Sequence, residues 1–179
     1  MKTKLRSLSR GQRMKAALLS SLAYRPQLVV LDEPFSGLDP LVRDEFLNGL
    51  LELTETEGWT VWISSHDIEE VERFADRVAF LNAGRVDLQE DTEGLLARFR
   101  QVELWFDEDA AKPAEIPEGW LNLQANGRSI RLVDSNYDES SSSFAFSNSF
   151  PDMRRHEARR MTLREIFVAL ARSGRAKPV

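Results

Sequence analysis

The sequence contains no cysteine and no apolar run long enough to cross a membrane. The missing thiols exclude disulfide bonds and thiolate metal sites, and they favour a reducing compartment such as the cytosol. Charged side chains recur through the first 20 residues, so no secretion signal is visible. With 179 residues, 42% of them hydrophobic, the chain is long enough for one domain with a core and a smaller appendage.

Acidic side chains are absent from the first 31 residues, although the whole chain has a net charge of −5. The overall negative charge argues against a nucleic-acid-binding protein. Two interpretations of the basic stretch remain open: a solvated helix face, or a surface that meets phosphate. Its basic residues are Lys2, Lys4, Arg6, Arg10, Arg13, Lys15 and Arg25.

Strand and helix patterns alternate over the first hundred residues, which predicts an α/β fold with a parallel sheet covered by helices. Both predicted strands are apolar on both faces, as buried parallel strands are. The expected elements are a helix from its N-cap Ser9 to Pro26, a strand at 28–31, a helix from Asp39-Pro40 to Gly58, a strand at 59–64, a short helix after His66 and a hairpin around 82–84.

The pattern changes after about residue 100, where a small α+β extension is expected. Asn126-Gly127 separates two strand-like runs and predicts a hairpin. The serine-rich stretch 139–149 is interpreted as a flexible loop, and the arginine-rich stretch 153–160 as a solvated linker or a basic helix. Thr162 and Glu165 form a capping box that predicts a terminal helix.

Two adjacent carboxylates, Asp32 and Glu33, end the first strand. Burying such a strand is costly unless a cation or a proton-transfer task lies at its tip. Because His66 follows the next strand, all three side chains are expected at the carboxyl edge of the sheet, where α/β proteins bind ligands. Phosphoryl transfer to water needs one carboxylate for Mg²⁺, one near the attacking water and a polar group near the phosphate.

Four motifs occur in order: LSRGQ at 8–12, LVVLDEP at 28–34, SGLD at 36–39, and His66. Together they resemble the second half of an ATP-binding cassette (ABC) nucleotide-binding domain: its signature motif, Walker B strand, D-loop and switch histidine. The resemblance covers residues 1–100 and implies a partial P-loop NTPase fold, with residues 101–179 as a strand-rich accessory region ending in a helix. It also implies ATP and Mg²⁺ as cofactors.

The resemblance assigns a role to each matching residue. Asp32 would hold Mg²⁺ through its water shell, Glu33 would polarise the attacking water, and His66 would contact the γ-phosphate. The signature residues Ser9, Gly11 and Gln12 would bind nucleotide by facing the γ-phosphate held by a partner subunit. Asp39 of the D-loop would also belong to the nucleotide-binding group and would reach across the dimer interface.

The phosphate-cradling motif G-x-x-x-x-G-K-[ST] is missing, as is any Gly-Lys dipeptide. By the resemblance, the chain begins in the middle of its domain, and a truncated reading frame, a split gene and a late start remain alternatives. We expect such a chain to be inactive alone and to expose an unpaired strand edge and a bare apolar face. Arg10 also departs from the family pattern, which most often has glycine there.

The resemblance implies an ATP-binding subunit of a bacterial export-type transporter, cytoplasmic and peripheral on the inner face of the cell membrane. Its partners would be transmembrane subunits and a second ABC ATPase domain, as a homo- or heterodimer, with no nucleic acid. One alternative is a non-catalytic remnant that contributes only its signature helix to a partner cassette. Another is a cassette acting on ribosomes or DNA ends, against which stand the missing second cassette and the absence of heptads or a dominant basic surface.

Overall fold

The structure is a computed structural model that describes residues 7–8, 10–82 and 84–173. The chain forms two compact units, Met1–Asp67 and Ile68–Val179, and each is described by itself. The boundary between the two units follows Asp67, earlier in the chain than the boundary near residue 100 that the sequence predicts. The reason is that Val78, Leu95 and Phe99 share one hydrophobic core with residues of the C-terminal helix.

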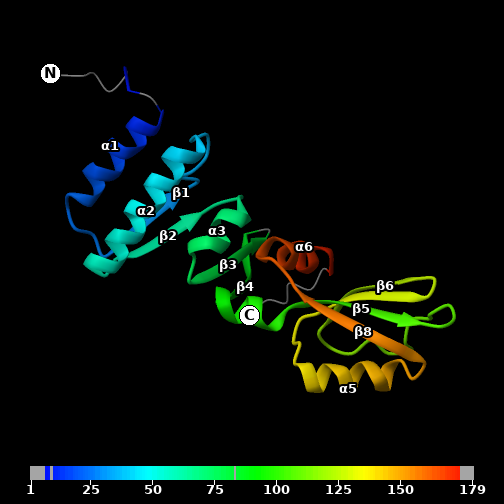
Figure 1. Ribbon diagram of the computed structural model, residues 1–179. Coiled ribbons are helices and arrows are strands. Elements are labelled where there is room, and N and C mark those ends of the chain that lie inside the picture. Colours follow the sequence, from blue (N-terminus) through cyan, green and yellow to red (C-terminus); the bar gives the residue numbers. More distant parts are fainter. Residues whose placement is uncertain (1–6, 9, 83, 174–179) are drawn as a thin grey trace. The chain divides into compact units, whose positions relative to one another are not determined.

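The first unit has the predicted order of helices and strands (Figure 1). Strands β1 and β2 pair in parallel, and their register places Asp32 opposite Ser64. The predicted α/β arrangement of the first unit is therefore confirmed, whereas the N-cap residue Ser9 lies outside the described residues. The elements are α1 (Arg10–Leu22), β1 (Leu28–Asp32), α2 (Pro40–Glu57) and β2 (Thr60–Ser64).

Helix α2 begins and ends as the sequence predicts. The Asp39 carboxylate accepts a hydrogen bond from the backbone N–H of Val42 at 3.1 Å, and Pro40 occupies the first turn. At the other end Gly58 adopts φ 67°, a left-handed conformation that glycine reaches without steric cost. These two caps fix the length of the connection between β1 and β2.

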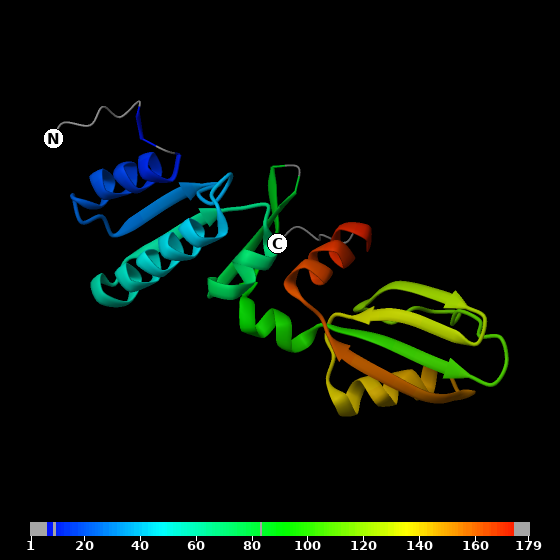
Figure 2. The same cartoon turned by 45° about the horizontal axis from the view of Figure 1, so that its top comes forward.

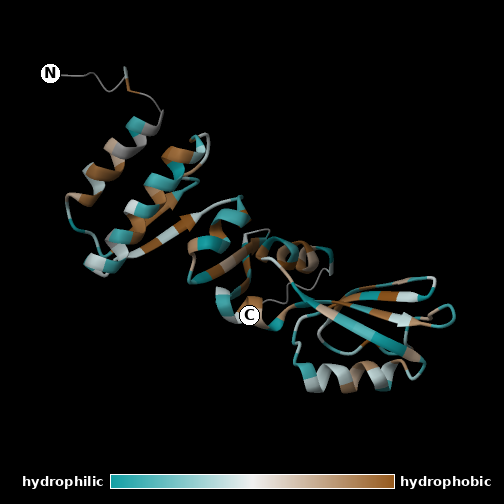
Figure 3. Ribbon diagram, viewed as in Figure 1, coloured by the Kyte–Doolittle hydropathy of each residue, from teal (hydrophilic) through white to brown (hydrophobic). Residues whose placement is uncertain are grey.

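The β1–β2 sheet is covered on one face only within the first unit. Val29 is 7% exposed, whereas its neighbour Val30 is 66% exposed. Trp62, which lies directly opposite Val30, is 62% exposed, and Leu28 on the same face is 52% exposed. Figure 3 shows both strands largely in the brown of hydrophobic residues. The unit thus presents the bare apolar face expected from the sequence.

We predict that the chain self-associates through this face, because contiguous exposed apolar side chains and unpaired strand edges favour association. Trp62→Lys should reduce the scattered-light mass of the purified protein at micromolar concentration, whereas Thr60→Lys, beside the apolar pair, should reduce it less. A monodisperse wild-type monomer with strong amide protection of residues 28–31 would contradict the prediction.

The first part of the second unit is a helical layer packed on a two-stranded hairpin (Figure 2). The hairpin β3–β4, predicted from the sequence, is confirmed. Its core includes Leu95, Leu163 and Ile166, all fully buried, and a stacked pair of rings, Phe80 and Phe167, 5.0 Å apart. The elements are α3 (Ile68–Phe74), β3 (Arg77–Asn82), β4 (Arg85–Asp91), α4 (Thr92–Arg98) and α6 (Leu163–Ser173).

The rest of the second unit is a four-stranded antiparallel sheet in the order β6-β7-β5-β8, with α5 against one face (Figure 2). The predicted Asn126-Gly127 hairpin joins β6 to β7 and is confirmed. A second core, including Leu104, Ile130 and Phe146, lies between the sheet and α5. The elements are β5 (Arg100–Phe106), β6 (Trp120–Asn126), β7 (Ser129–Asp134), α5 (Glu139–Ser149) and β8 (Met153–Arg160).

The prediction of a flexible loop at 139–149 is wrong, because these residues form α5. Asp138 caps the helix by accepting a hydrogen bond from the Ser141 N–H at 3.0 Å. Phe146 is fully buried and lies 5.2 Å from the ring of Trp120. A capping acid and one buried aromatic side chain thus outweigh the poor helix propensity of serine.

The prediction of a linker or basic helix at 153–160 is also wrong, because these residues form β8, paired with β5. His156 and Ala158 of β8 lie on the face towards α5; His156 lies 5.4 Å from the Phe146 ring, and Ala158 packs against the second core. Arg155 and Arg159 are exposed on the opposite face, where Arg155 lies over the Trp105 ring and Arg159 pairs with Glu165. Figure 3 shows β8 mostly in teal, the colour of hydrophilic residues.

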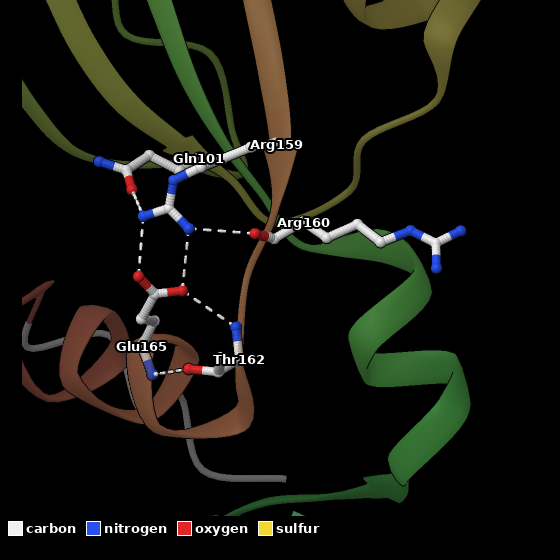
Figure 4. A network of polar contacts seen from close by, with 5 residues as sticks. All are labelled: Gln101, Arg159, Arg160, Thr162 and Glu165. Carbon is white, nitrogen blue, oxygen red and sulfur yellow. Dashed lines mark hydrogen bonds and ion pairs between the residues drawn. The ribbon is translucent and has the colours of Figure 1, made fainter.

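The predicted capping box of α6 is confirmed (Figure 4). Thr162 N–H donates to the Glu165 carboxylate at 3.0 Å, and Glu165 N–H donates to the Thr162 hydroxyl at 3.2 Å. Arg159 adds a forked contact with Glu165, at 2.7 and 3.0 Å, and a hydrogen bond to Gln101. The hydrogen bond from Arg159 holds the pKa of the Glu165 carboxyl below its usual range, which favours the charged form.

This fork predicts a pH-dependent contribution to stability. Since the folded state lowers the pKa of Glu165, its stabilisation is present above the pKa of the unfolded chain and is lost as the pH falls through the folded value. We expect Glu165→Gln, which keeps a capping amide oxygen, to lower the free energy of unfolding by about 0.5 to 1 kcal/mol at pH 7, the range for a partly exposed pair. In urea denaturation the difference should vanish towards pH 3; a difference that persists there would contradict this account.

Candidate functional site

The candidate site lies at the end of the first unit where both parallel strands finish. Asp32 is the last residue of β1 and Ser64 the last of β2, and they are register partners. Glu33 follows the first strand, and His66 follows the second. The structure therefore brings the predicted carboxylates and the predicted histidine to one edge of the sheet, as expected for an α/β ligand site.

The backbone of Glu33 is held in a conformation that is uncommon outside glycine. Its φ is 46°, and its N–H donates to the carbonyl oxygen of Ser64 at 3.0 Å and to the Ser64 hydroxyl at 3.2 Å. Behind it, Pro34 and Phe35 are buried, and the Phe35 ring meets Phe46 of α2 edge-on. Left-handed residues cost about 1 to 3 kcal/mol and persist where the surroundings over-determine them, which often marks functional sites.

Glu33 and His66 form the central contact of the site. The Nδ1 atom of His66 lies 2.8 Å from Oε2 of Glu33. The hydrogen bond to Glu33, together with its negative charge, raises the pKa of His66 above its ordinary value. The imidazole is 80% exposed and the carboxylate 37% exposed, so both remain open to a ligand. A carboxylate held by an imidazole can orient a water molecule and take its proton.

The contact predicts how His66 titrates. Because Glu33 is the largest cause of the raised pKa, with a smaller contribution from Asp67, Glu33→Gln should lower the pKa of His66 towards its ordinary value. The chain has two histidines, so imidazole NMR signals of the wild type and the variant can be compared residue by residue. The imidazole signal of His156, which packs in the other unit, serves as the control and should be the same in both proteins. A His66 titration curve unaffected by Glu33→Gln would refute the pairing.

Asp32 is positioned by a hydrogen bond from the Ser64 hydroxyl to its Oδ1 atom. Among the described residues no group of three or more acidic, histidine or cysteine side chains could hold a metal. That single carboxylate fits Mg²⁺, which is commonly bound by one or two carboxylates, several waters and substrate phosphates. It does not fit a cation that needs an all-protein cage.

The remaining predicted residues are Asp39, Gly11, Gln12 and Ser9, and the structure describes the first three of them. Asp39 uses its carboxylate as the N-cap of α2. Gly11 and Gln12 belong to the first turn of α1, which in both views runs opposite to β1, so that this turn lies at the end where the strands finish (Figures 1 and 2). Ser9 lies outside the described residues. The nucleotide-binding roles of these four residues stay predictions.

Two contacts of the site were not foreseen from the sequence. The Ser64 hydroxyl links Asp32 to the Glu33 backbone, and the register of adjacent parallel strands is the signal that could have indicated it. Asp67, beside the histidine, lies 3.6 Å from Arg43 of α2, and its N–H donates to Ser65 Oγ at 3.1 Å. Local hydrogen bonds and a contact with α2 thus shape the turn that carries His66.

Known proteins match the region that contains this site. Residues 2–72 match the model of an AAA domain described for the AbiEii toxin of type IV TA systems. The chain is 46% identical over 97 residues to the energy-coupling factor transporter ATP-binding protein EcfA of Methanothermobacter thermautotrophicus, covering 54% of this chain and 30% of that protein. It is 29% identical over 167 residues to the uncharacterized ABC transporter ATP-binding protein YhaQ of Bacillus subtilis, covering 92% and 55%.

A solved metal-chelate type ABC transporter in an inward-facing conformation matches with a TM-score of 0.50 and 30% identity, over 53% of this chain and 38% of the other. The predicted α/β fold of a partial ABC ATPase is confirmed at this level. The chain spans 30% of EcfA and 55% of YhaQ, in each case less than two thirds of the relative. In the part of the chain that the structure describes, no helix has the length and apolarity to span a bilayer.

Proposed function

We propose that the chain carries part of an ATP-binding domain of the ABC transporter type, and that it is an ATP-binding component of such a transporter that supplies the water-activating side of the ATPase site. The observation that carries this proposal is the 2.8 Å contact between Glu33 and His66, beside Asp32, at the shared end of two parallel strands. These three side chains meet the needs of phosphoryl transfer to water.

The side chains divide the work as follows. Glu33 orients the attacking water and accepts its proton, while His66 holds that carboxylate and places an N–H donor at the edge of the sheet. Asp32, held by Ser64, would accept hydrogen bonds from the water shell of Mg²⁺. Bound Mg²⁺ would neutralise phosphate charge during transfer. The positive φ of Glu33 turns the backbone away from the extended conformation of β1 at this residue.

Helix α1 supplies the second half of the proposal. Its first turn contains Gly11 and Gln12 and exposes backbone N–H groups of the kind that bind phosphate. By resemblance to the family, this turn, with Ser9, would meet nucleotide held by a second ABC ATPase domain, and Asp39 would contact that domain. The proposed partners are such a domain and transmembrane subunits, with the chain peripheral on the inner face of the cell membrane.

The direction of transport is a separate question. Among the relatives are a sulfate/thiosulfate import ATP-binding protein of Xanthomonas campestris, 48% identical over 80 residues, covering 45% of this chain and 23% of that protein, and the energy-coupling EcfA. These names do not support the export type expected from the sequence. The proposal is therefore restricted to ATP-driven transport, without a stated direction.

A second candidate function is favoured by one observation, namely that the sequence contains no G-x-x-x-x-G-K-[ST]. A chain without this loop could serve a partner cassette through α1 alone. The two candidates differ in one property: in the first, Glu33 activates water in a completed site; in the second, Glu33 is not used for turnover.

An ATPase assay on the chain and on a completed domain separates them. The 179-residue chain alone should hydrolyse ATP negligibly, since no loop cradles the β- and γ-phosphates. When the chain is joined to a segment with G-x-x-x-x-G-K-[ST] from a relative, Glu33→Gln should lower kcat by about 10²-fold or more and retain ATP binding, whereas Asp32→Asn should weaken Mg²⁺-dependent binding.

Glu45→Gln, an exposed acid of α2, serves as the matched control and should leave both quantities unchanged. Turnover by the chain alone that disappears in Glu33→Gln would overturn the prediction of inactivity. If Asp32→Asn and Glu33→Gln impaired affinity equally and left turnover per bound ATP unchanged, the assigned roles would be wrong and the non-catalytic candidate would stand.

A further inference from the structure

The four-stranded sheet of the second unit carries a hollow of about 380 Å³ on the face opposite α5. Helix α6 covers one end of this face, where Leu121 and Val133 join the core around Leu163. The remainder is open and charged. The hollow is lined by Gln101, Glu103, Trp105, Arg131, Glu157 and Arg159.

Glu103 and Glu157 are direct cross-strand neighbours on this face. Opposed residues of antiparallel strands have Cβ atoms about 5 Å apart, and like charges in such pairs are destabilising. Arg131 lies on the other side of Glu103, and its guanidinium is 3.4 Å from each carboxylate oxygen of Glu103, which is long for such a contact. Within residues 84–173, Glu157 makes no hydrogen bond or ion pair through its side chain. The side chain of Glu157 therefore lies beside a like charge with no ion pair of its own among these residues.

The other arginines near the hollow are already engaged. Arg159, which lines the hollow, is paired with Glu165 through a fork and bonded to Gln101 (Figure 4). The guanidinium of Arg155 lies 4.1 Å over the ring of Trp105. Arg131, in contrast, is 59% exposed, and its ion pair with Glu103 is long, at 3.4 Å. It is the guanidinium most able to bind a further carboxylate.

We propose that this hollow binds a small zwitterion, a free α-amino acid with an apolar side chain. The ammonium group would lie between Glu103 and Glu157, and the carboxylate would bind Arg131. These groups lie in one row across β7, β5 and β8, where neighbouring strands are about 4.8 Å apart. The half-buried indole of Trp105, one side of which is covered by Arg155, is the apolar group of the lining that the side chain would contact. The volume of the hollow is in the range of small-molecule sites.

A purely anionic or purely cationic ligand fits the same row less well. An anion bound to Arg131 would face the two carboxylates, and a cation bound between the carboxylates would leave the loosely held guanidinium unused. A zwitterion satisfies both signs of charge at once. This inference concerns the second unit alone and does not depend on the proposed ATPase role of the first.

Equilibrium dialysis of the full chain with radiolabelled L-leucine or L-phenylalanine tests the proposal. We expect at least one of these probes to bind with a dissociation constant of about 1 mM or below, the range for a ligand of this size. N-acetyl-leucine, which lacks the ammonium, and leucine methyl ester, which lacks the carboxylate, should compete at least tenfold more weakly. No binding of either amino acid, or equal competition by a derivative, overturns the proposal.

Variants separate the hollow from other surfaces. Glu157→Gln and Arg131→Gln should each weaken binding of the probe at least tenfold, whereas Glu115→Gln, an exposed acid away from the lining residues, should leave it unchanged. Glu157→Gln removes the opposed like charge, so its melting temperature should equal or exceed that of the wild type. Unchanged affinity in both hollow variants, with the fold intact, would refute the site.

Discussion

The parallel pairing of β1 with β2 is the constraint on which the candidate site depends. Its register sets Asp32 beside Ser64. The residues that follow the two strands, Glu33 and His66, are thereby brought to the same end of the sheet. A shift of one residue would turn Asp32 to the other face of the sheet. The capped helix α2 between the strands protects this register, because Asp39 and Gly58 fix where the connection leaves and re-enters the sheet.

Much of the site could be predicted because its signals are local. A strand of apolar residues that ends in two acids, and a second strand followed by a histidine, imply a common edge once the sheet is known to be parallel. The Ser64 hydroxyl ties Asp32 to the Glu33 backbone because Ser64 and Asp32 are register partners, and this register is itself a tertiary feature. The sequence could not show that Glu33 has a positive φ, at a turn whose next two residues, Pro34 and Phe35, are buried.

The second unit was predicted well where turns and caps decide the structure, and poorly where burial does. Asn126-Gly127 and the Thr162–Glu165 capping box carry their own conformational preference. The serine-rich helix α5 and the arginine-rich strand β8 have little conformational preference of their own. They are ordered by Phe146 and His156, which pack against each other across the second core. Local composition therefore indicated solvated segments, and tertiary contacts overrode it.

Each unit contains one energetically unfavourable local arrangement in or beside its sheet. In the first, a non-glycine residue occupies a left-handed conformation; in the second, two carboxylates face each other across a strand pair. Departures of this kind are expected at functional sites, where local stability is exchanged for a defined arrangement of groups. Behind Glu33 lies the buried Pro34-Phe35 turn, and next to Glu157 in the sequence Arg159 is paired with Glu165. The side chains that remain exposed there, the carboxylate of Glu33 with His66 and the row from Arg131 to Glu157, are the ones that we propose bind a ligand.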